Sequence, residues 1–110
     1  MSDERQTEPS FERLAARFKD NRMVSKGTGF GTNSGLRVGG KIFAMIVRGE
    51  LVVKLPRDRV DQLVEVGVAS RFDAGKGRPM KEWASVPSEH RRRWQQLADE
   101  AFEFVKAGAK

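Results

Sequence analysis

The clearest hydrophobic pattern lies near the C-terminus. Apolar side chains recur there three and four positions apart, which places them on one face of an α-helix. These positions are Trp94, Leu97, Ala98, Ala101, Phe102 and Val105. We expect this helix to open at Pro87-Ser88 and to end at Gly108. The same spacing predicts a shorter helix near the N-terminus, capped by Ser10. Its apolar face consists of Phe11, Leu14, Ala15 and Phe18.

The middle of the chain favours β-strands. Residues 41–47 are apolar on both faces, which is typical of a central strand that is covered on both sides, or in part by a partner. Residues 50–55 alternate between apolar and other side chains, as a half-buried strand does. Gly39-Gly40 indicates either a hairpin turn or a bulge, and Arg48-Gly49 predicts a turn after residue 47.

Weaker strand signals flank this hairpin. Residues 23–30 form a weak candidate because three glycines loosen them, and residues 36–38 start the next strand. After the hairpin, Pro56 suits the first turn of a helix that ends at Gly67. Residues 69–72 and 80–86 predict two further strands.

The elements add up to helix, three strands, helix, two strands and helix. Short turns between successive strands imply antiparallel pairing, and the helices can cover one face of the sheet. We therefore predict a two-layer α+β fold with a five-stranded antiparallel sheet in α-β(3)-α-β(2)-α order. Residues 1–9 are expected to form a disordered tail, and residues 10–110 a single domain.

Composition narrows the class of protein. The 110 residues include no cysteine, which excludes disulfides, thiolate metal sites and cysteine nucleophiles. The first nine residues lack an apolar signal segment, and the longest apolar run, residues 42–47, is far shorter than the roughly 20 residues that span a bilayer. We predict a soluble, cytoplasmic protein with no membrane partner.

The charge points to a partner class. The net charge is +6 and the isoelectric point is about 10.2, in the range where nucleic-acid binding is a first hypothesis. Residues 71–94 hold seven basic and three acidic side chains, which concentrates +4 of this charge in one stretch. Within it, Trp83 is a candidate for base stacking, although its alternation with Ala84 favours a core position. The candidate phosphate contacts are Lys76, Arg78, Lys81, Arg91 and Arg92.

None of the sequence patterns considered as catalytic or metal-binding motifs is complete. The glycines of residues 27–35 match neither the P-loop nor the dinucleotide-binding arrangement. His90 is the only histidine, and without cysteine it cannot build an ordinary transition-metal site. Two acidic pairs, Asp58 with Asp61 and Asp99 with Glu103, are typical of solvated helix faces. We therefore expect a protein that is not an enzyme and binds no metal or cofactor.

Several segments together carry a family resemblance. They read KIFAMI at residues 41–46, GELVVKLP at residues 49–56 and GRPMKEW at residues 77–83, with Gly67 between the last two. From about residue 30 to residue 105, the chain resembles the TfoX N-terminal-domain family and, more distantly, the YjbR-like (MmcQ) family. At residues 27–33 it departs from the family's more usual Met-Phe-Gly-Gly.

The resemblance implies the same element order and supplies no catalytic motif. TfoX proteins are named for regulating competence, and their N-terminal domain usually precedes a helix-hairpin-like domain. YjbR-like proteins are often labelled DNA-binding by fold analogy. We thus predict a small non-enzymatic regulatory or binding domain that binds nucleic acid through its basic loop. The alternative is a protein-interaction module that acts through a sheet edge or the apolar strand, as a homodimer or with a regulatory partner.

Overall fold

The computed structural model describes residues 11–18, 20–26, 35–72 and 81–108. The predicted tail, the Ser10 cap, most of the glycine cluster and the basic loop at residues 73–80 lie outside the described residues. A helix at residues 11–16 comes first. The other elements are β1 (Val24–Lys26), β2 (Gly35–Val38), β3 (Lys41–Val47), β4 (Glu50–Lys54), α2 (Arg57–Glu65), β5 (Ser70–Arg71), β6 (Trp83–Val86), the 3₁₀-helix η1 (Ser88–Arg93) and α3 (Trp94–Gly108).

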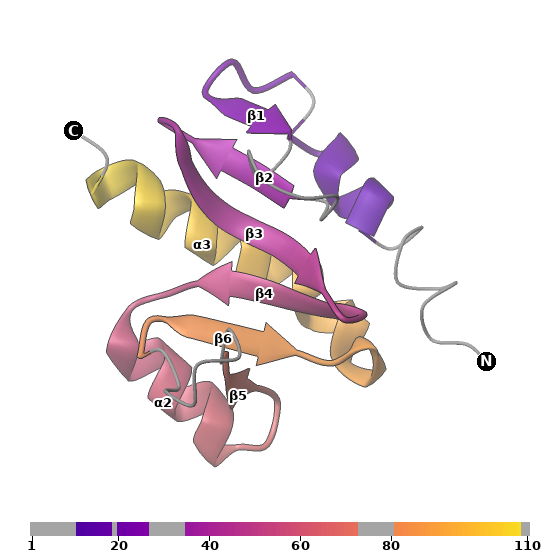
Figure 1. The fold of residues 1–110 in the computed structure, drawn as a ribbon, viewed down its shortest axis with the longest axis vertical. Helices are drawn as coiled ribbons and strands as arrows, with labels where there is room; N and C mark the ends of the chain where they lie inside the picture. Colours follow the sequence, from indigo (N-terminus) through magenta and orange to yellow (C-terminus); the bar gives the residue numbers. More distant parts are fainter. Residues whose placement is uncertain (1–10, 19, 27–34, 73–80, 109–110) are drawn as a thin grey trace.

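The strands form one antiparallel sheet of six strands in the order β1-β2-β3-β4-β6-β5 (Figure 1). The α+β class and the antiparallel pairing are confirmed. The five-stranded count and the α-β(3)-α-β(2)-α order are wrong by one strand, because Gly39-Gly40 forms a turn that separates β2 from β3 and four strands therefore precede α2. Val24–Lys26 forms its own ladder with β2, from Val24 opposite Val38 to Lys26 opposite Leu36. Paired backbone there outweighs the weak local propensity.

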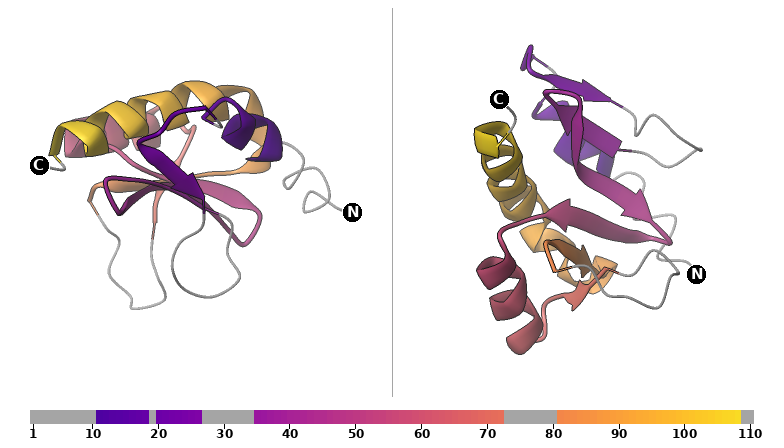
Figure 2. Two further views of the ribbon diagram at one scale, coloured as in Figure 1. Left: turned by 90° about the horizontal axis from the view of Figure 1, so that it is seen from above. Right: turned by 60° about the vertical axis from the view of Figure 1, so that its left-hand side comes forward.

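The three α-helices of the described residues lie on one side of the sheet, which gives two layers (Figure 2). The apolar stripe predicted for α3 is buried against the sheet, as are the four apolar residues predicted for the first helix. Phe18, Phe43 and Phe102 pack as an aromatic cluster, with ring centroids 5.3–5.6 Å apart. No helix in the described residues is long and apolar enough to cross a membrane.

A β-bulge sets which side chains of β3 face the helices. Leu36 pairs with Ala44, but the next residue of β2, Arg37, pairs with Ile42, so Phe43 is the extra residue. Phe43 and Ala44 therefore both join the helix-side core, while Ile42 belongs to an apolar cluster on the other face. The prediction that β3 is apolar on both faces and central in the sheet is confirmed.

The last predicted helix is divided in two. His90, at φ −109° and ψ 24°, leaves the helical region, and its N–H donates to the carbonyl of Pro87 (2.9 Å) in a tight 3₁₀ turn. The three arginines at residues 91–93 consequently lie on η1 and not on the first turn of a continuous α-helix. At the end of α2, Gly67 has a φ of +81°, as its predicted role as a helix stop requires.

Candidate functional site

A groove opens where two neighbouring strands separate. Ala44 opposite Val53 is the last pair between β3 and β4. Beyond it, Ile42 pairs with β2, whereas Lys54 pairs with Trp83 of β6. The C-terminal turns of α3 lie behind the resulting gap (Figure 1). The divergence of the strands therefore leaves a cavity of about 520 Å³ that reaches from the outer face of the sheet to α3.

We call this cavity the Trp83 groove. Its described lining residues come from β2, the β2–β3 turn, β3, β4, β6 and α3, and none of them is acidic. They are Arg37, Gly40, Lys41, Ile42, Lys54, Trp83, Phe104, Val105 and Gly108. The volume falls within the range of sites for small organic molecules, so a single base or nucleotide can enter whereas a duplex cannot.

Two of the three cations of the groove lack an anionic partner in the structure as described. No carboxylate among the described residues forms an ion pair with Arg37 or Lys41, and the Nε of Arg37 is buried without a hydrogen-bond acceptor. Lys54 is partly engaged, since its Nζ lies 3.8 Å from Oε1 of Glu82. A buried guanidinium N–H without an acceptor is costly, so an anion that enters the groove meets donors that are already desolvated.

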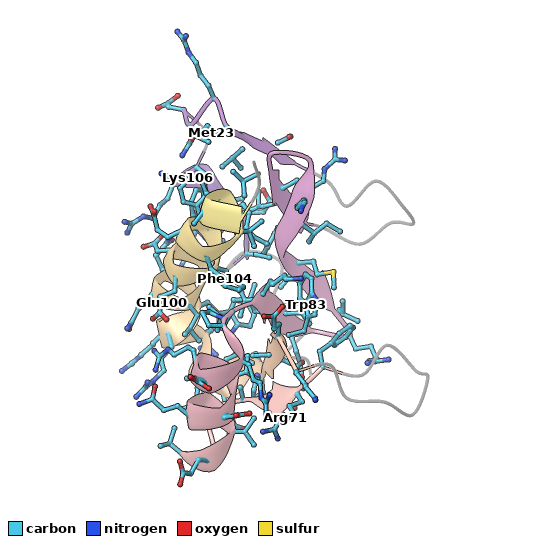
Figure 3. All side chains as sticks on the ribbon, turned by 90° about the vertical axis from the view of Figure 1, so that its left-hand side faces the viewer. Met23, Arg71, Trp83, Glu100, Phe104 and Lys106 are labelled. Carbon is cyan, nitrogen blue, oxygen red and sulfur yellow. The ribbon has the colours of Figure 1, made fainter. Side chains whose placement is uncertain are left out.

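Two aromatic side chains add flat apolar surface. Trp83 from β6 and Phe104 from α3 lie on the same side of the molecule and are both half-buried (Figure 3). The Nζ of Lys54 lies 5.5 Å from the centroid of the Trp83 ring, within the range of a cation–π contact. Trp83 thus packs against the outer apolar cluster and also lines the groove. The two positions considered for Trp83, in the core and available for base stacking, therefore do not exclude each other.

No protein-family model, curated protein or solved structure matches this chain. The resemblance to the TfoX N-terminal-domain family stays a prediction that rests on the residues quoted for it.

The structure separates the described members of the predicted basic site. Lys81 is exposed and comes two residues before Trp83, next to the groove. Arg91 and Arg92 are exposed on η1, beyond the other end of β6. With a rise of about 3.3 Å per residue, β6 alone holds these two positions at least about 10 Å apart. Lys76 and Arg78 lie outside the described residues.

Arg91 and Arg92 instead meet a residue from the start of the chain. Together with Arg13 of the first helix, they line a smaller cavity of about 260 Å³, which we call the arginine pocket. Its other described lining residues are Leu14, Trp94 and Gln95. Sequence reasoning could not have paired Arg13 with η1, because nearly 80 positions separate them.

The three cations of the groove, Arg37, Lys41 and Lys54, and its second aromatic residue, Phe104, were not predicted as site residues from the sequence. Lys54 carried a usable signal, because its alternation with Val53 and Leu55 places it on the outer face of β4. Phe104 lies off the main stripe of α3, beside Val105. It is half-buried at the edge of the helix-side core, and the signal in that case is a large apolar residue next to the predicted stripe.

The described histidine and acidic residues singled out in the sequence have local surroundings. No group of three or more histidine, aspartate or glutamate side chains is placed there to hold a metal ion. His90 lies 3.5 Å from the carboxylate of its neighbour Glu89. The predicted acidic pairs have local partners: Asp61 accepts a hydrogen bond from Arg71, and Asp99 accepts one from Gln95.

Proposed function

We propose that this chain is a non-enzymatic binding domain of the TfoX N-terminal type and that it binds single-stranded nucleic acid in the Trp83 groove. One observation carries the proposal: three cations and two aromatic side chains line a single groove whose described residues include no acid. Proteins that bind single strands combine such cations, which follow the phosphates, with aromatic rings on which bases stack.

The position of the groove fits this role. Gly40 stands on its rim with a φ of +81° and no atom near the place of a Cβ, so a strand of nucleic acid can approach the backbone closely there. One of the predicted phosphate contacts, Lys81, is exposed and stands two residues before Trp83 in the sequence.

Fluorescence anisotropy with a labelled oligonucleotide of about ten thymidines tests the proposal, with a duplex of the same length for comparison. If three phosphates are neutralised, the affinity should fall about 20-fold between about 50 mM and 200 mM salt, given a slope of about −0.7 per phosphate on single strands. The duplex should bind more weakly, because its bases are not free to enter the groove.

Matched variants separate charge from stacking. Lys41→Gln removes one exposed cation of the groove and should reduce the salt slope by about 0.7. Trp83→Ala should weaken binding by about 1–3 kcal/mol and leave the salt slope unchanged. Arg57→Gln is the control, since Arg57 is an exposed cation on α2 that does not line the groove.

Three results would count against this function. The first is an affinity independent of salt, and the second is an equal loss in Lys41→Gln and Arg57→Gln. The third is the absence of binding at low salt, which would direct the search to a protein partner. Binding in the groove predicts that Lys41→Gln and Trp83→Ala weaken the complex while Arg57→Gln does not. Non-specific attraction to a basic protein would respond to Arg57→Gln as much as to Lys41→Gln.

A further inference from the structure

The arginine pocket lies at the opposite end of α3 from the Trp83 groove. Trp94 and Gln95 in its lining open α3, while Phe104 and Gly108 of the groove close it. Ten residues of helix correspond to about 15 Å. The two cavities are therefore separate sites, and a role for one does not imply a role for the other.

Three arginines from two elements line this small cavity. Arg13 comes from the first helix, and Arg91 and Arg92 come from η1. All three residues are exposed, and within the described residues no carboxylate pairs with any of them. Like charges held around one concavity repel each other, and a bound anion would relieve that repulsion.

Two local features prepare the cavity for an anion. Nη1 of Arg91 donates to the carbonyl of Ser88 (3.1 Å), which fixes that side chain and leaves its other N–H groups free to donate. The indole of Trp94 is 1% exposed, and its Nε1 has no hydrogen-bond acceptor. A buried N–H without a partner is rare and calls for an explanation. Because Trp94 also lines the arginine pocket, its indole N–H is a donor close to any anion that binds there.

We propose that the arginine pocket binds a phosphate monoester group. A monoester carries a charge of about −1.5 to −2 at neutral pH and accepts two parallel hydrogen bonds from a guanidinium, which suits three arginines better than a carboxylate does. The cavity of about 260 Å³ lies below the usual range for whole ligands, so it admits the phosphate and leaves the remainder of the molecule outside.

The two tryptophans provide the readout. In a two-dimensional ¹H–¹⁵N NMR spectrum, each indole N–H gives its own resonance, so Trp94 reports on the pocket and Trp83 on the groove. Inorganic phosphate is titrated into the protein at constant ionic strength, with sodium chloride as the balancing salt, to remove general screening effects. We expect the Trp94 indole resonance to shift to saturation and the Trp83 resonance to stay in place.

Three variants on the same two elements complete the experiment. Arg13→Gln and Arg92→Gln should each raise the Kd for phosphate at least about fivefold, because each removes a charge-assisted hydrogen bond. Arg93→Gln should leave the Kd unchanged, since Arg93 is an equally exposed arginine of η1 that does not line the pocket. Arg91 is left intact, because it also donates to the carbonyl of Ser88 within η1.

A second arm identifies the source of the phosphate. If the group is the end of a nucleic-acid strand, a 5′-phosphorylated oligonucleotide binds more tightly than its 5′-hydroxyl form, and Arg92→Gln removes the difference. If it belongs to a small molecule, a nucleoside monophosphate shifts Trp94 and the two oligonucleotides bind alike. The proposal is overturned if the Trp94 resonance does not shift, or if Arg93→Gln weakens phosphate as much as Arg92→Gln does.

Discussion

The bulge in β3 makes a prediction that strict alternation along the strand would not make. If alternation continued from Ile46 through Ala44, Ile42 would face the helices and Phe43 would face outward. The bulge exchanges them, so that Phe43 is fully buried in the helix-side core and Ile42 is half-buried on the outer face. Replacing each residue by alanine therefore tests the register of the sheet directly.

The cost of Phe43→Ala follows from what the ring contacts. Its centroid lies 5.3 Å from that of Phe18 and 5.6 Å from that of Phe102, both in edge-to-face geometry. Removal of a fully buried phenylalanine costs about 3–5 kcal/mol, of which each aromatic pair contributes about 0.5–1.5 kcal/mol. Since domains of this size are stable by about 5–15 kcal/mol, the variant should remain measurable but be close to unfolding.

Urea unfolding, followed by far-UV circular dichroism, measures the effect. Phe43→Ala should lower the transition midpoint strongly at constant slope, and Phe43→Leu should lose about 1–2 kcal/mol, because it keeps much of the volume and loses the ring pairs. Ile42→Ala is the matched control and should cost clearly less than Phe43→Ala. The reasoning is refuted if Ile42→Ala is the more damaging change, since that order belongs to a strand without a bulge.

Three further predictions concern other parts of the molecule. Glu100→Gln should destabilise the fold by about 1 kcal/mol in urea unfolding, because Arg59 of α2 holds both carboxylate oxygens of Glu100 on α3, at 2.8 and 3.0 Å. Gly39→Asn should raise the thermal midpoint by about 2–4 °C, since φ is +60° at Gly39 and +81° at Gly40, the turn geometry for which Asn-Gly is preferred. Glu82→Gln should tighten oligonucleotide binding about two- to fivefold in anisotropy, because it releases Lys54 from its only carboxylate partner among the described residues.

The buried side chains of an element were predictable wherever the element has one periodic apolar face and packs against one neighbouring layer. The stripe of α3 is an example, because six apolar positions at helical spacing leave only one way to place the helix on a sheet. The glycine pair at Gly39 and the stop at Gly67 were also readable from the sequence. Their positive φ values are a local property that few residues other than glycine tolerate.

Features that depend on pairing between distant segments were not predictable in the same way. Residues 23–30 were only a weak strand candidate, and it is the pairing with the edge of β2 that makes Val24–Lys26 into β1. The bulge at Phe43 is likewise a property of the ladder between β2 and β3, since Lys41–Val47 is apolar at almost every position and fits either register equally well.

The Trp83 groove shows why charge along the sequence is an incomplete guide to a binding surface. Residues 71–94 hold the excess of basic residues, yet the cations that line the groove, Arg37, Lys41 and Lys54, lie outside that stretch. They come together because β3 stays paired with β2, and β4 stays paired with β6, at the place where β3 and β4 separate from each other. The surface that a cation lines therefore depends on the strand with which its own strand pairs. Trp83 belongs both to the basic segment and to the lining of the groove.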